Sequence, residues 1–198
     1  MTVDLDTPLR LPCGVELPNR LLKSAMTEGL ADDHDRATRR HATLYRCWAQ
    51  GGTGTLVTGN VMIDRRFLER PGNVVIDGNG GMAALRRWAA AGTANGNQLW
   101  MQISHPGRQC GRLVSRRPRA PSAVGLDLLG LFARPAAMGA ADIEGVLERF
   151  AWVAGIARET GFTGVQLHAA HGYLISEFLS PLTNRRRDQW GGDLAARA

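Results

Sequence analysis

The sequence predicts an α/β fold with four parallel strands, arranged either as a doubly wound sheet or as a barrel. Short apolar runs alternate with segments that carry apolar residues at helical spacing, which implies parallel pairing with right-handed crossovers. Gln102 and His168 fall at the C-terminal ends of two predicted strands, where barrel enzymes place their chemistry. No GxGxxG sequence, the usual signature of a dinucleotide-binding doubly wound sheet, follows the first strand. The barrel is therefore favoured.

The N-terminal quarter of the chain predicts a hairpin, a strand and a helix. Residues 8–18 form the hairpin, with Gly14 at its turn, and residues 21–26 form a compact apolar strand. The helix covers residues 41–50, because apolar residues recur there at helical spacing and the pair Gly51-Gly52 ends it. A loop connects the strand to this helix.

The next segment predicts two more strands with a helix between them. Residues 55–63 form the second strand, and the helix lies within residues 80–96. Residues 99–104 form the third strand, on which Gln102 shares a face with Trp100. Each strand is thus followed by a helix that can cover one face of the sheet.

The last part of the chain opens with a long segment, residues 106–141, that is rich in proline and glycine and has no sustained period. Loops of this length are uncommon in compact domains and are often functional. A helix follows at residues 142–160, and then the fourth strand at residues 165–167. Residues 191–198 predict the beginning of a further helix.

Length and composition predict a single globular domain, residues 1–198. The chain is 44% hydrophobic, and no run is long enough to span a bilayer. No signal peptide is visible at the N-terminus, so we expect a cytoplasmic protein that does not bind a membrane. Cys13, Cys47 and Cys110 are odd in number and far apart, which argues against a disulfide framework and against a zinc site made by this segment.

The positive charge raises the question of nucleic-acid binding. The formal net charge is +6, it comes almost entirely from arginine, and Lys23 is the only lysine. Residues 116–119 and 185–187 form two arginine clusters. The clusters are short, Asp188 follows the second directly, and no basic stretch with interleaved aromatic residues is present. We therefore expect no nucleic-acid partner.

The candidate functional residues gather at the end of the fourth strand, in GFTGVQLHAAHGYLISEF (residues 161–178). Alternation along the strand puts Gln166 and His168 on one face. His171 and Tyr173 follow at once, so three hydrogen-bond donors cluster where the strand gives way to a loop. The two histidines could be part of a metal site, but two histidines alone are a weak zinc signature, and we expect no metal.

Four collinear segments resemble the old yellow enzyme family. They are LPNRLLKSAMTEGLAD (17–32), TGNVMIDRR (58–66), QLWMQISHPGRQ (98–109) and GFTGVQLHAAHGYLISEFLSPLTNRRRDQWGGDLAAR (161–197). These are the NADH:flavin oxidoreductases, FMN-dependent ene-reductases on a (β/α)8 TIM barrel. The resemblance implies that this chain covers roughly the first four β/α units of such a barrel, preceded by the N-terminal hairpin.

The resemblance also implies roles for individual residues. His168 and His171 match the pair that holds the carbonyl oxygen of the substrate, and Tyr173 matches the proposed proton donor. The matches to cofactor-binding positions beside the flavin are Ser24, Ala25, Met26, Thr27, Asn60, Gln102 and His168. Gln166 stands where relatives commonly have Glu.

The chemistry explains these residue types. Hydride from reduced FMN can reach the β-carbon of an enone only if the charge that arrives on the carbonyl oxygen is stabilised, and two imidazole N–H donors can do so. A neighbouring phenol can then protonate the α-carbon as a general acid. Each of two residues also has a structural role as an alternative: Gln102 can be a buried polar group whose hydrogen bonds are satisfied within the core, and Tyr173 can be a packing residue.

The implied cofactors are FMN and, as reductant, NADH or NADPH, with a small-molecule enone as substrate. The family's flavin arginine and phosphate-binding loops lie in the second half of the barrel, beyond these four units. The edges of strands one and four would be left unpaired. We therefore expect a homo-oligomer or a C-terminal half-barrel partner, with a catalytically silent, self-associating fragment as the alternative.

Overall fold

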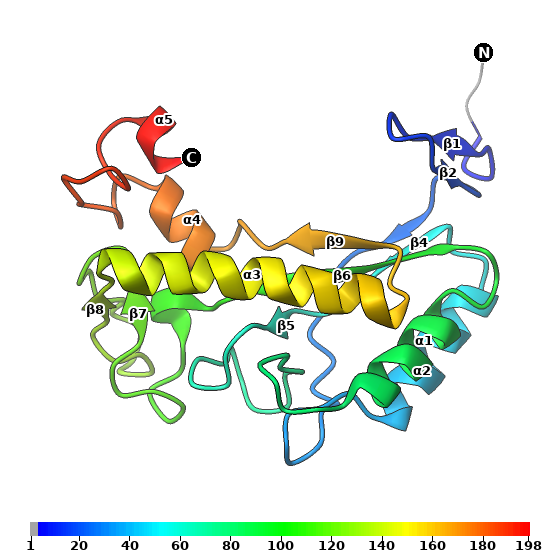
Figure 1. Cartoon of the computed structure of the whole chain (residues 1–198), viewed down its shortest axis with the longest axis horizontal. Helices are drawn as coiled ribbons and strands as arrows, with labels where there is room; N and C mark the ends of the chain where they lie inside the picture. The colour runs from blue at the N-terminus through cyan, green and yellow to red at the C-terminus, as the bar shows by residue number, and fades with distance from the viewer. Residues whose placement is uncertain (1–3) are drawn as a thin grey trace.

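The structure, a computed structural model, describes residues 4–198 and is organised around one parallel sheet (Figure 1). Its strands run in the order β3 (Leu22–Lys23), β4 (Thr55–Val57), β6 (Gln98–Ser104) and β9 (Gly164–Leu167), with all pairs parallel. A short strand, β5 (Val61–Met62), pairs with the C-terminal end of β6, on the side of β4. The prediction of four parallel strands with intervening helices is confirmed.

The second predicted strand, residues 55–63, is wrong as a single strand. It is interrupted between β4 and β5, because the Thr58 side chain enters the ladder and its Oγ1 accepts the backbone N–H of Gln102 at 2.9 Å. Gly59 allows the break, since a Cβ there would lie 2.3 Å from the carbonyl oxygen of Met26. The interruption leaves Asn60 between the two strands at the C-terminal edge of the sheet.

The first strand is also shorter than predicted. Residues 21–26 were expected, whereas β3 pairs with β4 only over Leu22 and Lys23. The last pair joins Lys23 to Leu56, one residue before β4 ends at Val57. Before the sheet, β1 (Leu9–Arg10) and β2 (Glu16–Leu17) form the predicted antiparallel hairpin, with Gly14 at φ +89° in its turn.

Three helices cover one side of the sheet: α1 (Arg39–Gln50), α2 (Met82–Gly92) and α3 (Ala140–Thr160) (Figure 1). α1 and α3 each begin two residues earlier than predicted. The predicted first residues, His41 and Asp142, lie inside the first turn, where their side chains accept the backbone N–H of Thr38 and Gly139 at 3.0 and 2.9 Å. The capping contact explains both shifts.

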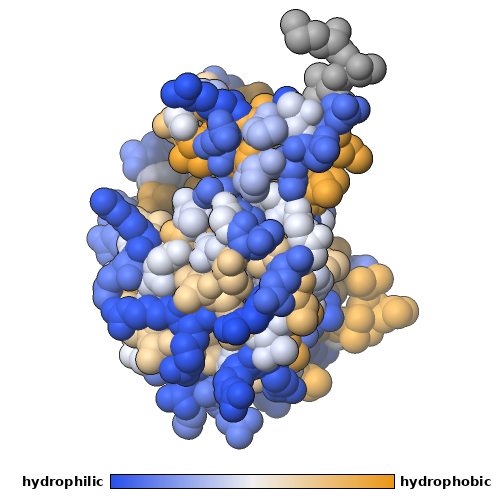
Figure 2. Space-filling view, turned by 90° about the vertical axis from the view of Figure 1, so that its right-hand side faces the viewer, coloured by the Kyte–Doolittle hydropathy of each residue, from blue (hydrophilic) through white to orange (hydrophobic). Residues whose placement is uncertain are grey.

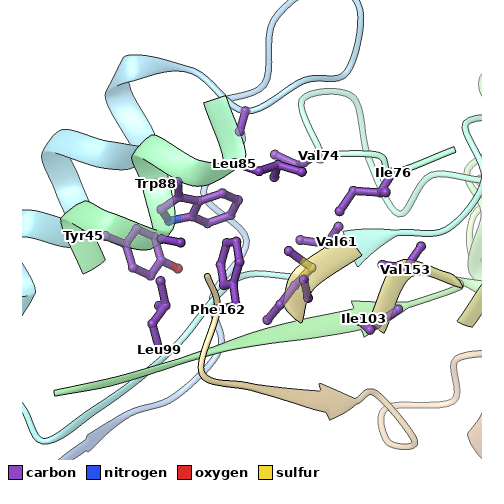
Figure 3. Packing of buried hydrophobic residues seen from close by; sticks show 14 of the residues in the cluster. Tyr45, Val61, Val74, Ile76, Leu85, Trp88, Leu99, Ile103, Val153 and Phe162 are labelled. Carbon is purple, nitrogen blue, oxygen red and sulfur yellow. The ribbon is translucent and has the colours of Figure 1, made fainter. Parts of the chain in front are cut away.

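The hydrophobic core lies between these helices and the sheet (Figure 3). The Trp88 ring is at its centre, with its centroid 5.2 Å from that of Tyr45 and 5.5 Å from that of Phe162. The odd-numbered residues of β6 point to the helices and are fully buried: Leu99, Met101 and Ile103. Gln102 and Ser104 therefore lie on the opposite face of the sheet, as predicted for a barrel interior.

The long segment 106–141 contains more structure than the sequence predicts. It holds the 3₁₀ turn η1 (Gly107–Gln109) and the paired strands β7 (Arg119–Ala120) and β8 (Ala136–Ala137). After β9 come α4 (Leu174–Leu179), which was not predicted, and α5 (Leu194–Arg197), which was. Single 3₁₀ turns and two-residue strands carry too little periodicity to be seen in the sequence.

The exterior is mixed in polarity. Figure 2 shows hydrophilic side chains spread over the α1–α2 end of the molecule, and hydrophobic ones both near the N-terminal hairpin and in a separate group that projects at the right of the view. Among residues 4–198, no helix is long and apolar enough to cross a membrane.

Candidate active site

The three residues predicted after the fourth strand form one cluster of rings. The His168 ring lies edge-on to both of the others, with centroid separations of 5.1 Å from His171 and 4.8 Å from Tyr173. The cluster forms because the chain leaves β9 at His168 and turns at once into α4, for which Tyr173 is the N-cap residue. His168 is buried, His171 is exposed and Tyr173 is half-buried.

The hydrogen bonding of His168 determines which ring nitrogen can bind a ligand. Its Nδ1 accepts the backbone N–H of Ala170 at 3.3 Å, and burial, together with the neighbouring His171, lowers the pKa of the ring below its ordinary value. At neutral pH the imidazole is therefore uncharged, with its proton on Nε2. His168 can thus donate one hydrogen bond from Nε2 to an oxygen atom of a ligand.

Tyr173 is kept in its protonated form. Burial, followed by the carboxylate of Glu69, raises the pKa of the phenol, and the guanidinium of Arg70 opposes this in part. Glu69 and Arg70 form an ion pair of 2.7 Å in the loop after β5. The phenol therefore carries a proton at neutral pH that it can donate.

Gln102 pairs with the polar residue of the neighbouring strand. β6 and β9 are in register at Gln102 and Gln166, and Nε2 of Gln102 donates to Oε1 of Gln166 at 2.8 Å. On the same face of β6, the Ser104 hydroxyl is buried without a hydrogen-bond partner among residues 4–198. This face of the sheet thus presents the paired amides of Gln102 and Gln166, whereas the Ser104 hydroxyl is enclosed by protein.

Thr27 and Asn60 meet at the ends of the first two strands. The Thr27 hydroxyl donates to Oδ1 of Asn60 at 2.9 Å, and Nδ2 of Asn73 donates to the same oxygen at 3.1 Å. Asn60 is buried, so its amide orientation is determined by these two contacts. The Thr27 hydroxyl also lies 3.4 Å from Oε2 of Glu69, the carboxylate that acts on Tyr173.

Ser24, Ala25 and Met26 run along the same edge of the sheet, between β3 and Thr27. Ser24 and Met26 are exposed, and Met26 keeps 52% of its accessible surface. In the part of the chain that the structure describes, no helix covers the face of the sheet that carries Gln102 and Gln166, opposite to α1, α2 and α3 (Figure 1). The predicted residues therefore form three local groups on one edge, namely residues 24–27 with Asn60, Gln102 with Gln166, and the ring cluster.

A buried network behind this edge was missed by the sequence analysis. The carboxylate of Glu28 accepts the Tyr45 hydroxyl and, at 3.0 Å, the backbone N–H of Gly59. Nζ of Lys23 donates to the carbonyl oxygen of Val57 at 2.6 Å and to the Tyr45 hydroxyl at 3.3 Å. The network joins residues next to Thr27 and Asn60, so it holds these two strand ends together. The only signal in the sequence was that Lys23 is the single lysine.

Lys23 is electrostatically unusual. Desolvation by burial lowers the pKa of its ammonium group to about 8, although Glu28 opposes the shift. Nζ lies 4.4 Å from the centroid of the Trp48 ring and 5.0 Å from that of Tyr45. The two rings replace part of the water that would otherwise surround the charge.

The donor set is suited to an organic cofactor. Within the described residues, no group of three or more His, Cys, Asp or Glu side chains is placed to hold a metal ion. The polar groups at the strand ends are instead the amides of Gln102, Gln166 and Asn60 and the hydroxyl of Thr27, which are hydrogen-bonding groups suited to a polar organic ligand.

Comparison with known proteins agrees with this chemistry. The model of the family described as NADH:flavin oxidoreductase / NADH oxidase matches residues 4–198. The chain is 37% identical to the NADH-dependent flavin oxidoreductase iliE of Hypocrea jecorina, over 96% of this chain and 52% of that protein. It is 40% identical to the NADH-dependent flavin oxidoreductase nadA of Aspergillus parasiticus, over 91% of this chain and 44% of that protein.

Solved structures give the same picture. Morphinone reductase in complex with tetrahydroNAD superimposes with a TM-score of 0.89 at 27% identity, covering 99% of this chain and 57% of that one. The old yellow enzyme homologue from Zymomonas mobilis has a TM-score of 0.87 at 29% identity, covering 98% and 56%. The fold is thus part of a TIM barrel, and the chain spans about half the length of these relatives.

Proposed function

Because this chain belongs to the NADH:flavin oxidoreductase / NADH oxidase family, of the old yellow enzyme type, we propose that it serves in FMN-dependent reduction of activated C=C bonds. The substrate class is the enones, and the reductant is NADH or NADPH. The observation that carries the proposal is the ring cluster after β9, in which two imidazoles and one phenol lie close enough together to contact a common ligand.

The two histidines bind the carbonyl oxygen of the substrate. The Nε2–H of His168 points away from the backbone contact made by Nδ1, and the exposed ring of His171 supplies the second donor. Negative charge develops on that oxygen during reduction, so donors that are already oriented stabilise the transition state more than the ground state. Because burial and the neighbouring His171 lower the pKa of His168, its imidazole stays neutral and donates through Nε2–H.

Tyr173 delivers a proton to the α-carbon. Its raised pKa keeps the phenol protonated, and its ring lies edge-on to His168, so the phenol is beside the imidazoles that would bind the substrate. Proton donation by a positioned phenol is ordinary general acid catalysis. Phe in place of Tyr173 would leave the two histidines that bind the carbonyl oxygen, His168 and His171 (the substrate clamp), intact and remove only this proton.

FMN supplies the hydride when bound. The residues that would hold its ring lie at or near the C-terminal ends of the strands, and they are Ser24, Ala25, Met26, Thr27, Asn60, Gln102 and His168. The Gly59 backbone packs closely against Met26 and Glu28, which holds the ends of the first two strands together beside these residues. A C-terminal half-barrel, in the same protein or as a partner, would supply the phosphate-binding part of the cofactor site.

A second candidate role is that of a silent half-barrel that associates with itself. Both edge strands expose apolar side chains: Leu21 and Leu22 at the β3 edge are 44% and 52% exposed, and Val165 and Leu167 on β9 are 40% and 54% exposed. Unpaired strand edges of this kind favour pairing with another chain.

Flavin absorbance separates the two roles. The purified protein, incubated with FMN and desalted, should retain the flavin bands and oxidise NADH or NADPH when an enone is added. A colourless protein that gains neither absorbance nor activity, and that elutes as a large assembly, would support the silent role for this chain.

A further inference from the structure

The main chain at His171 adopts a conformation that histidine seldom takes. His171 has φ +59° and Gly172 has φ +73°, so two successive residues are left-handed. Glycine adopts this conformation freely, whereas in histidine the Cβ crowds the following carbonyl group. The turn therefore persists only where contacts from elsewhere hold it, and it determines where the His171 ring points.

One side chain from another loop holds this turn. Nε2 of Gln109 donates to the carbonyl oxygen of His171 at 2.6 Å, across 62 positions of sequence. Gln109 belongs to η1, the turn that follows β6, whereas His171 belongs to the loop that follows β9. The contact therefore crosses between the ends of two neighbouring strands.

The loop that carries Gln109 is itself anchored. The backbone N–H of Arg108 donates to Oε1 of the buried Glu177 at 2.8 Å, and that of Gly107 donates to Nδ1 of His105 at 3.0 Å. The backbone N–H of Leu174 donates to the carbonyl oxygen of His105 at 3.1 Å. η1 and the start of α4 thus form one frame, to which the Gln109 amide is attached.

Gly172 leaves room for the hydrogen bond between Gln109 and His171. A Cβ built on Gly172 would lie 2.8 Å from Nε2 of Gln109, closer than side chains tolerate, and its positive φ disfavours other residues as well. The absence of a side chain at position 172 therefore lets the Gln109 amide reach the His171 carbonyl group.

We infer that Gln109 is a positioning residue for the substrate clamp: its amide donor maintains the left-handed turn that directs the His171 ring toward His168. This inference rests on the proposed function, since it assigns the clamp a ligand. The donor is the essential property, because the acceptor is a carbonyl oxygen. A carboxylate of the same size cannot donate, and it would repel that oxygen.

The test compares Gln109→Glu with Gln98→Glu, the same change at the opposite end of β6. The first readout needs no flavin: the three-bond coupling between the amide and α protons of His171, together with its carbon shifts, reports φ in the chain itself. The second is the dissociation constant of phenol for protein loaded with FMN, from the perturbation of the flavin spectrum. Gln109→Glu should move the His171 signals out of the left-handed range and weaken phenol binding about tenfold, the loss of about 1.4 kcal/mol. Gln98→Glu should change neither.

Two results would overturn the inference. Unchanged His171 signals in Gln109→Glu would show that the contact does not hold the turn. Changed signals with unchanged phenol affinity would show that the turn does not position the clamp. If the unaltered chain takes up no FMN, the proposed function fails for it, while the His171 signals still decide whether Gln109 holds the turn. Gly172→Ala is a second variant, and it should alter the same signals by displacing the Gln109 amide.

Discussion

Replacing Tyr45 by Phe tests whether the buried network behind the sheet edge stabilises the fold. The change removes one oxygen and leaves the ring, which is fully buried against Trp88 and Trp48, so no large cavity forms. The hydroxyl donates to the Glu28 carboxylate and accepts from Lys23, and burial raises its own pKa well above the usual range. Without it, Glu28 keeps only the backbone N–H of Gly59 within the network.

The expected loss is about 2 kcal/mol in the free energy of unfolding, because hydrogen bonds to charged groups contribute about 1.5–3 kcal/mol and the partners stay buried. In urea this should lower the midpoint by roughly 1 M for an m-value of about 2 kcal/mol/M. Tyr173→Phe is the matched control, since Tyr173 is the only other tyrosine and no hydrogen bond contributes to its pKa shift. The control should stay within about 0.5 kcal/mol of the unaltered protein. Equal effects of the two substitutions would refute the reasoning.

Three further predictions concern single residues. The side chain of Lys23, the only lysine, should titrate by NMR with a midpoint near 8. The free energy of unfolding should rise with pH from about 8 to 10.5, because the unfolded chain binds more protons than the folded one in that range. An NMR midpoint near the ordinary lysine value would contradict the burial argument. Burial raises the pKa of Glu177 from 4.5 to about 8, so its contribution should make stability fall as pH rises between these values, and Glu177→Gln should reduce that slope in urea unfolding at pH 5 and pH 8. Gly164→Ala should cost about 1–3 kcal/mol by urea unfolding, since its Cβ would lie 2.7 Å from the Trp100 ring, whereas Gly155→Ala on α3 meets no atom within 4 Å and should stabilise.

The strand ends and the ring cluster could be predicted from sequence because their signals are local. The apolar run before His168 and the alternation along residues 98–104 define two strands, and two in-register parallel strands then bring Gln102 beside Gln166. The proximity of His168, His171 and Tyr173 follows from their spacing along one loop.

The remaining features depend on contacts between distant residues. The break after β4 arises because the Thr58 hydroxyl accepts a backbone N–H from Gln102, 44 positions away. Glu28 meets Tyr45 and Gly59 only after β3 and β4 have paired, and Gln109 meets His171 only after β6 and β9 have paired. Helix α4 has six residues, too few for a helical period to show in the sequence.

Phenol titration of FMN-loaded protein, with and without the substitution His168→Ala, tests the central claim most directly. The claim is that the cluster after β9 binds the oxygen of a ligand that lies against the flavin. His168→Ala should weaken phenol binding by tenfold or more while changing the affinity for FMN much less, because it removes the Nε2–H donor that this claim assigns to the ligand oxygen. Unchanged phenol affinity in His168→Ala, with FMN still bound, would contradict the assignment of this cluster as the substrate clamp.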